Sequence, residues 1–218
     1  MTAVNGVGGK EAAMAEKRDE VFIWITWLSK VMAGEHACEW ASWFKAHHEN
    51  YAKVPSDFDI AKWKIEHTRR LRELRLQRQK LGERVFVEGE NQIRCASPQG
   101  MIVAGKPDLI SVRNGAPKIY DVKTGQPRSS NEVQVMLYMH LLPQAIPAYR
   151  GMRPTGCVVY NDSRVEIPAE AVDESFAENF EYFLDVIGSE AAAIKVPSRN
   201  ECKFCDIAKS ECPERIEG

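Results

Sequence analysis

Two acidic residues and a lysine, placed where predicted strands begin and end, could together hold a divalent cation against a phosphodiester. Asp108 follows a Gly-Lys-Pro bend, and Asp121 and Lys123 flank Val122 at the end of the alternating segment 118–123. Residues i and i+2 of a strand share a face, so Asp121 and Lys123 are expected on one side while Val122 points into the core. Because a bound Mg²⁺ or Mn²⁺ would remove the repulsion between the carboxylates, the pattern predicts metal-assisted hydrolysis. Lys123 would orient the attacking water and offset charge on the phosphate.

A helix is expected directly after these strands, over residues 131–142. The sequence Thr-Gly-Gln-Pro at 124–127 ends the strand, and Ser129, Ser130 or Asn131 can cap the helix. Gln134 and Tyr138 are four residues apart on this helix, so both share the face that is directed back at the predicted site. Each residue taken singly is well explained as a turn residue or a solvated strand end, but the ordered set favours a functional site.

The ordered set resembles the motifs of the PD-(D/E)XK nucleases, specifically the RecB-like branch that includes the CRISPR-associated iron–sulfur exonucleases. Gly105-Lys-Pro-Asp108 matches the acidic motif of that branch, Asp121-Val-Lys123 its Asp/Glu-x-Lys motif, and Gln134-Val-Met-Leu-Tyr138 its Gln-x-x-x-Tyr motif. The resemblance runs from about residue 38 to residue 212. It implies a restriction-endonuclease-like fold of the α/β class, with a mixed central sheet flanked by helices.

The resemblance also implies two further metal ligands. A histidine on an earlier helix completes the metal shell in that family, and His67, in Trp63-Lys-Ile-Glu-His67, is the matching residue. The main-chain carbonyl between the acid and the lysine, here that of Val122, is the other. The chain has further histidines at 36, 47, 48 and 140, and a lone histidine on a helix is commonly structural. The predicted catalytic set is Lys123, Asp108, Asp121, Gln134 and Tyr138, and the predicted metal ligands are His67, Asp108, Asp121 and Val122.

Four cysteines indicate a second metal centre. Cys202, Cys205 and Cys212 have the spacing C-x₂-C-x₆-C, and tightly spaced thiols without a secretion signal are more typical of metal ligands than of disulfides. Cys38 matches the early cysteine of the RecB-like iron–sulfur nucleases. The resemblance therefore implies a [4Fe–4S] cluster held by one early and three late cysteines, with a structural role. Structural Zn²⁺ is the alternative, because four thiolates also form a closed zinc site.

The charge distribution favours a nucleic-acid partner, although the net charge of the chain is only −2. Between residues 62 and 84 there are nine Lys or Arg and three Glu, whereas residues 162–190 contain nine acids and one Arg. This asymmetry predicts one face for a polyanion and one face turned away from it. A basic helix that is merely solvated is the alternative for the first segment.

Composition predicts one globular domain. With 218 residues, of which 44% are hydrophobic, the chain can bury one core. We expect a disordered start at 1–10 and a single nuclease domain at 11–218, in which Cys38 and residues 197–213 form the clasp around the cluster. The apolar run 21–28 is too short to cross a bilayer and too far from the start for a signal peptide, so a cytoplasmic protein is expected. Helices are predicted at 11–33, near 38, and at 58–81, 131–142 and 173–188, and strands at 84–94, 99–104, 108–113, 118–123, 155–160 and 164–167.

Together these features predict a Mg²⁺- or Mn²⁺-dependent DNA nuclease, most simply an exonuclease acting on single-stranded or frayed ends in DNA processing, repair or CRISPR-type adaptation. The glycine-rich stretch 6–10 lacks the residues of a phosphate-binding loop, so any helicase work would come from a partner. A helicase, or a CRISPR or repair protein, is the expected kind of protein partner, and no membrane partner is expected. Two alternatives remain: a DNA-binding accessory subunit active only in a larger complex, and an endonuclease of phage or mobile-element origin.

Overall fold

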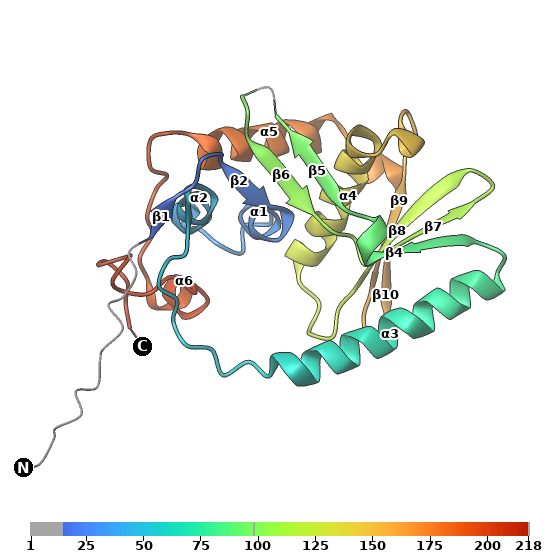
Figure 1. Cartoon of the computed structure of the whole chain (residues 1–218), viewed down its shortest axis with the longest axis horizontal. Helices are drawn as coiled ribbons and strands as arrows, with labels where there is room; N and C mark the ends of the chain where they lie inside the picture. The colour runs from blue at the N-terminus through green and yellow to red at the C-terminus, as the bar shows by residue number, and fades with distance from the viewer. Residues whose placement is uncertain (1–14, 98, 218) are drawn as a thin grey trace, which may run out of the picture.

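The computed structural model describes residues 15–97 and 99–217 and arranges them as two main sheets with helices around them (Figure 1). The expected disordered start at 1–10 lies outside the described residues. The structure has mixed sheets flanked by helices, as the α/β prediction requires, but the strands form separate five-stranded and three-stranded sheets rather than one central sheet. A two-stranded ribbon pairs β1 (Glu16–Lys17) with β3 (His48–Glu49).

The five-stranded sheet carries the motif strands. Its order is β10-β9-β8-β7-β4, and only the β8–β9 pair is parallel. A parallel pair needs a crossover connection, which here is the helix α4 (Ser129–Ala145) predicted after the motif strands. The strands are β4 (Arg84–Val87), β7 (Leu109–Arg113), β8 (Ala116–Val122), β9 (Thr155–Val159) and β10 (Arg164–Ile167).

The two faces of this sheet bury different residues against different helices. On one face Tyr120 and Val122 of β8 pack with Leu74 of α3 (Ile60–Lys80), the predicted basic helix. On the other face Ile119 belongs to the main core, which includes α4. Because side chains alternate along β8, Asp121 shares the face of Ile119 and is directed toward α4. The strand period therefore presents the Asp121 carboxylate to the helix that carries Gln134.

The three-stranded sheet corrects two predictions. Its order is β2-β6-β5, with β2 (Phe22–Trp24), β5 (Ile93–Ala96) and β6 (Ile102–Gly105). The predicted helix at 11–33 is wrong within the described residues, because 22–24 form a strand parallel to β6 and helix α1 (Ile25–Met32) begins only afterwards. The predicted strand at 84–94 is also wrong, because a 3₁₀ turn at Glu88–Glu90 separates β4 from β5 and directs them into different sheets.

Helices α2 (Glu39–His47), which follows Cys38, and α5 (Glu174–Gly188) agree with the predicted positions. The short helix α6 (Arg199–Lys203), which contains Cys202, was not predicted. Further 3₁₀ turns lie at Pro147–Tyr149 and Ala169–Ala171. Asp59 begins α3 by accepting a hydrogen bond from the main-chain nitrogen of Lys62 (2.9 Å), and Asp173 caps α5 in the same way. No helix among the described residues has the length and apolar character needed to cross a bilayer.

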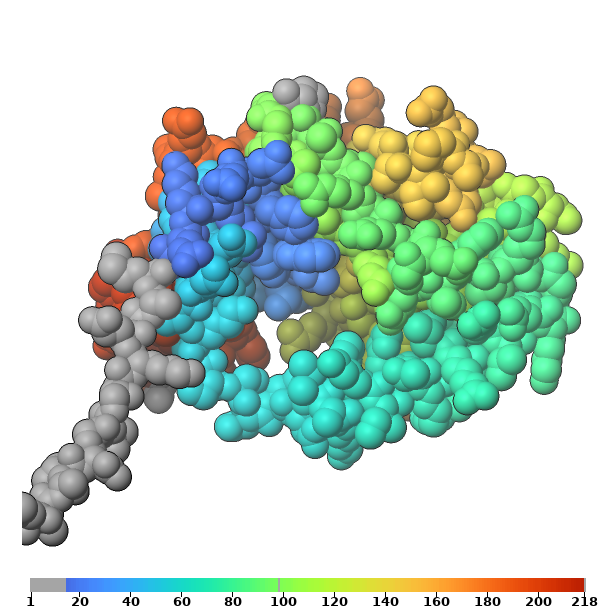
Figure 2. Space-filling model, in the orientation of Figure 1, coloured from blue at the N-terminus to red at the C-terminus, as the bar shows by residue number. Residues whose placement is uncertain are grey.

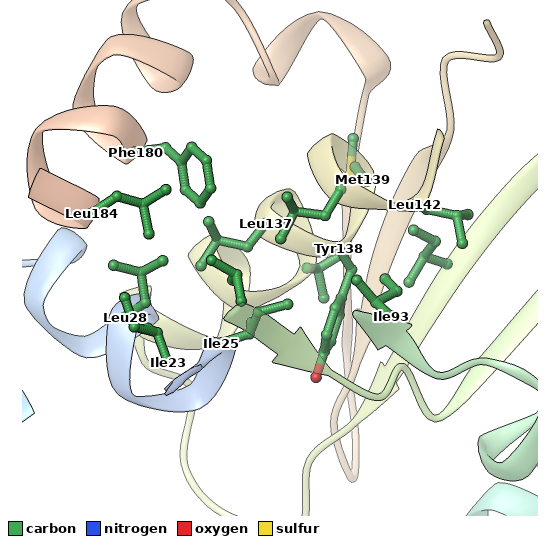
Figure 3. Packing of buried hydrophobic residues seen from close by; sticks show 14 of the residues in the cluster. Ile23, Ile25, Leu28, Ile93, Leu137, Tyr138, Met139, Leu142, Phe180 and Leu184 are labelled. Atoms are coloured by element: carbon green, nitrogen blue, oxygen red, sulfur yellow. The ribbon is translucent and has the colours of Figure 1, made fainter. Parts of the chain in front are cut away.

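The main core joins α1, α4 and α5 to the three-stranded sheet. Figure 3 shows Leu28 of α1, Leu137 of α4 and Leu184 of α5 directed toward one another. Tyr138 extends from α4 beside Ile93, so one residue of the predicted site is anchored in the hydrophobic core.

Gly105, which precedes the predicted metal ligand Asp108, leaves no room for a side chain. A Cβ atom there would lie 2.6 Å from Cδ1 of Ile25 and 2.7 Å from Cε1 of Tyr138. We expect Gly105→Ala to lower the free energy of unfolding by about 1–3 kcal/mol through overpacking. Urea denaturation should show this loss, whereas Gly125→Ala, at a position with no heavy atom within 4 Å, should show little change. Equal stability of the two variants would contradict the packing described for Gly105.

Candidate metal centre and active-site cleft

The predicted site residues line one open cleft of about 420 Å³. The cleft lies where the end of β8 meets α3, α4 and the connection between β6 and β7. From these four elements come His67, Asp108, Asp121, Val122, Lys123, Gln134 and Tyr138. The structure therefore brings together all the residues that the sequence motifs singled out, with the two carboxylates in the same cleft.

His67 and Asp108 form a direct contact across the cleft. His67 is buried on α3, and its Nε2 lies 3.1 Å from Oδ2 of Asp108. The main-chain nitrogen of Val122 donates to the same oxygen at 2.7 Å. The hydrogen bond to Asp108 raises the pKa of His67, although burial opposes the shift. Trp63, one turn earlier on α3, stacks on the His67 ring at 5.0 Å and holds the imidazole plane.

The loop that carries Asp108 is fixed by the neighbouring turn. The main-chain nitrogen of Glu88 donates to the main-chain oxygen of Asp108 at 3.2 Å. The buried side chain of Asn91 donates to the main-chain oxygens of Phe86 (3.0 Å) and Pro107 (3.4 Å). Since these bonds join the turn after β4 to Pro107 and Asp108, that turn holds the loop in place and with it the Asp108 carboxylate.

Asp121, Lys123 and Gln134 form a triangle of one ion pair and two hydrogen bonds. Lys123 Nζ lies 2.7 Å from Oδ2 of Asp121 and donates to Oε1 of Gln134 at 2.9 Å. Gln134 Nε2 in turn donates to Oδ1 of Asp121 at 3.2 Å. Asp121 is only 2% exposed, and burial raises its pKa while the neighbouring Lys123 opposes the rise. These contacts hold the Lys123 ammonium next to the buried Asp121 carboxylate.

Tyr138 connects the triangle to the Asp108 loop. Its hydroxyl accepts a hydrogen bond from Gln134 Nε2 at 3.0 Å, and its ring lies against Gly105, where an added Cβ would be 2.7 Å from Tyr138 Cε1. Burial raises the pKa of Tyr138 well above its usual range, so the hydroxyl stays protonated. Tyr138 is therefore a positioning residue, since it links α4 to the segment between Gly105 and Asp108.

The start of α4 is capped from a distant segment. The carboxylate of Glu35 accepts from both the main-chain nitrogen and the hydroxyl of Ser130, each at 2.8 Å. The expectation that a serine or asparagine at 129–131 caps this helix is therefore wrong. The residue before the helix is Arg128, which makes no side-chain cap, and Glu35 supplies the acceptor instead. This anchor sets the position of the helix face that carries Gln134.

Glu88 is a candidate ligand that the motifs did not reveal. The imidazole of His67 and the carboxylates of Glu88 and Asp108 each offer a ligand atom within 4.8 Å of the others, an arrangement that could hold a metal ion. Lys106 Nζ lies 3.3 Å from Glu88 Oε2. The strand register explains the position of Glu88, because β4 pairs Val87 with Leu109 and so places Glu88 beside Asp108. The predicted strand at 84–94 ran through the 3₁₀ turn at Glu88–Glu90, and Glu88 was therefore not recognised as a residue at the end of a strand.

The donor set in this cleft fits a divalent cation. One imidazole nitrogen and several carboxylate oxygens are ligands that Mn²⁺ and Mg²⁺ accept, with nitrogen favouring Mn²⁺. Asp121 adds a buried carboxylate, whose charge is costly in an apolar setting and which the Lys123 ammonium offsets only in part, since burial still raises its pKa. The cleft thus contains candidate metal ligands and an ammonium group, and it is open to a substrate.

Glu88→Gln tests the contribution of this carboxylate. We expect the variant to bind Mn²⁺ about ten-fold more weakly, because an amide oxygen carries no charge to offset the cation. Isothermal titration at constant pH measures the affinity. Glu90→Gln is the matched control, since Glu90 lies two residues away and contacts only the main-chain nitrogen of Val87 among the described hydrogen bonds. Equal Mn²⁺ affinity in wild type and Glu88→Gln would exclude Glu88 as a ligand.

The four cysteines predicted to bind a second metal also lie together. Cys38, Cys202, Cys205 and Cys212 line one narrow, mostly apolar pocket with Trp40 and Ile207. The Glu201 carboxylate fastens the early cysteine to α6, because it accepts from the main-chain nitrogens of Ala37 (3.0 Å) and Cys38 (3.3 Å). The early and late parts of the chain therefore meet at these thiols.

Arg215 closes the cysteine pocket. Its guanidinium donates to the main-chain oxygens of Cys202 (2.8 Å), Cys205 (2.9 Å) and Ile207 (2.8 Å). The main-chain N–H of residue 216 contacts Cys202 Sγ at 3.4 Å. Burial raises the pKa of the Cys205 and Cys212 thiols, so a bound cation would be needed to hold them as thiolates near neutral pH.

Comparison with known proteins identifies the family of the chain. The family profile described as the PD-(D/E)XK nuclease superfamily matches residues 11–213. Among solved structures, that described as "Crystal structure of SSO0001" is 18% identical with a TM-score of 0.44, and the match covers 93% of this chain and 91% of that chain. No curated protein matches the chain. The profile spans nearly the whole sequence, and the chain therefore belongs to the PD-(D/E)XK nuclease superfamily, a group of nucleic-acid hydrolases that use divalent metals.

Proposed function

We propose that this nuclease hydrolyses DNA from single-stranded or frayed ends with Mn²⁺ or Mg²⁺, and that it belongs to the RecB-like branch with an iron–sulfur cluster. One observation carries the catalytic part of the proposal. The Asp121–Lys123–Gln134 triangle and the His67–Asp108 pair line the same open cleft. A charged donor beside metal-ligand carboxylates is the arrangement that phosphodiester hydrolysis needs.

Each residue of the cleft has a distinct part in the proposed mechanism. His67, Asp108, Asp121 and the Val122 carbonyl would hold the cation, which supplies Lewis-acid stabilisation of the phosphate and activation of water. Lys123 donates a hydrogen bond to the attacking water and offsets negative charge on the phosphate oxygens. Gln134 accepts a hydrogen bond from Lys123 and donates one to Tyr138, so these two residues would keep the ammonium in position.

The surface beside the cleft supports a polyanionic substrate. Helix α3, which carries His67, has five cations that form no ion pair with a described residue: Lys62, Lys64, Arg72, Arg75 and Lys80. Most of the acids of the 162–190 segment lie in or just before α5, on the opposite side of the molecule from α3 (Figures 1 and 2). The acids of α5 are therefore separated in space from α3, whereas Asp162 lies beside it, and phosphates would be attracted to the unpaired cations of α3.

The order of the cysteines, one early and three late, is that of the RecB-like iron–sulfur nucleases, and it favours a [4Fe–4S] cluster over zinc. All four thiols line one pocket, which either metal centre would require. The proposed cluster would join Cys38 to the C-terminal segment, which gives it a structural role.

Degradation of defined DNA substrates tests the proposed activity. The protein would be purified without air and incubated with end-labelled linear and covalently closed single-stranded DNA, with Mn²⁺, Mg²⁺ or a chelator, beside RNA of the same sequence. We expect metal-dependent loss of linear DNA with closed circles spared. Cutting of the circles would show an endonuclease instead. If no nucleic acid is hydrolysed under any condition, the protein is an accessory subunit and the proposed activity is wrong.

A further inference from the structure

Two exposed tryptophans line the cleft, and the proposed chemistry assigns no task to their exposed faces. Trp24 is 40% exposed and Trp63 is 37% exposed, and both belong to the lining that contains Asp108 and Lys123. A large aromatic surface in contact with water is unfavourable, and its presence in a functional cleft is typical of a surface that a ligand covers.

The two rings reach the metal-binding end of the cleft from separate parts of the fold. Trp24 ends β2 and pairs with Ala104 in β6, the strand that leads to Asp108. Trp63 lies in the first turn of α3, one turn before His67. Both rings line the cleft that contains His67 and Asp108, so a phosphodiester bound at that pair would have aromatic rings from two elements within the same cleft.

We propose that Trp24 and Trp63 stack on the nucleobases next to the phosphodiester in the cleft and thereby select unpaired nucleotides. This inference rests on the proposed nuclease function and adds the feature of the substrate that the site recognises. Every base offers an aromatic face, so stacking binds single strands with little dependence on sequence. In a duplex both faces of a base are covered by its neighbours, and the rings of the two tryptophans would find no free face.

A purely structural role for these residues makes a different prediction. Trp63 stacks on His67, and Trp24 makes an edge contact with Phe22 at 5.2 Å. If these contacts are the only role of the two rings, removing the rings would change metal affinity or protein stability. Any loss of DNA affinity would then be the same for an intact strand and for a strand without bases. Dependence on the bases therefore separates the two accounts.

The test compares an intact single-stranded oligonucleotide with one in which abasic residues replace the nucleotides at the end. Dissociation constants would be measured by fluorescence anisotropy with Ca²⁺ in the Lys123→Ala background, so that the result does not depend on hydrolysis. We expect Trp24→Ala and Trp63→Ala each to weaken binding of the intact strand about ten-fold and to leave binding of the abasic strand unchanged. The Phe variants should bind nearly as wild type.

Tyr182→Ala is the matched control, because Tyr182 is an aromatic residue on α5 with 57% exposure, remote from the cleft lining. It should bind both strands as wild type does. An equal loss of affinity for the intact and abasic strands in the Trp variants, or no loss for either, would overturn the proposal. Failure of the wild type to hydrolyse DNA would contradict the proposed function separately, since the binding test requires no hydrolysis.

Discussion

Replacing Lys123 with alanine should lower the rate of DNA hydrolysis by at least about a hundred-fold while DNA binding and metal loading stay nearly unchanged. The Lys123 ammonium lies 2.7 Å from Asp121, is held by Gln134 and lines the cleft in which the proposed mechanism places the water and the phosphate. The variant keeps His67 and both carboxylates, so a divalent cation should still bind. Rates on end-labelled single strands, together with Mn²⁺ titration, measure the two properties separately.

Lys118→Ala is the control for the loss of a lysine. Lys118 lies on the same strand, β8, and pairs with Glu166 away from the cleft, so its loss should leave the rate unchanged. A Lys123→Ala protein as active as the wild type would overturn the mechanism. Loss of Mn²⁺ binding in that variant would instead show that Lys123 acts by supporting the metal site.

Replacing Cys205 with alanine should remove the visible colour of the protein and lower its thermal stability in the same variant. Cys205 contributes to the pocket in which the early Cys38 meets the late cysteines, so loss of the cluster would detach the C-terminal segment from α2. We expect the midpoint of thermal unfolding to fall by at least about 5 °C, since each kcal/mol corresponds to roughly 2–4 °C in a chain of this size. Visible absorption, iron and zinc analysis, and thermal unfolding provide the readouts.

Cys95→Ala is the matched cysteine control, because Cys95 lies in β5 and is not part of the cysteine pocket. It should keep both colour and metal content. A wild-type protein that is colourless, stable and loaded with zinc would exclude the cluster and favour the zinc alternative.

The grouping of the candidate site residues in one cleft could be predicted because short spacings determine which side chains share a face. Asp121 and Lys123 are two apart on a strand, and Gln134 and Tyr138 are four apart on a helix. A parallel strand pair requires a helical crossover, so the helix had to return across the sheet next to β8. The observed triangle of Asp121, Lys123 and Gln134 follows from these local rules.

Features that depend on pairing between distant segments were missed. The apolar run 21–28 fits a buried helix or a buried strand, and only pairing with β6, which begins at Ile102, makes Phe22–Trp24 a strand. Glu88 enters the cleft because β4 stops at Val87 and pairs with Leu109. The cap of α4 joins Glu35 to Ser130, which are 95 positions apart, and no local sequence pattern predicts such a contact.

Anomalous diffraction from crystals of the full chain soaked in Mn²⁺ would locate the cation without any assumption about activity. We expect one strong peak in the cleft, in contact with His67 Nε2 and the carboxylate of Asp108, and next to Asp121 and Lys123. A peak that is absent from this cleft in wild-type crystals, or that lies only at other surface carboxylates, would contradict the proposed metal centre and the nuclease mechanism built on it.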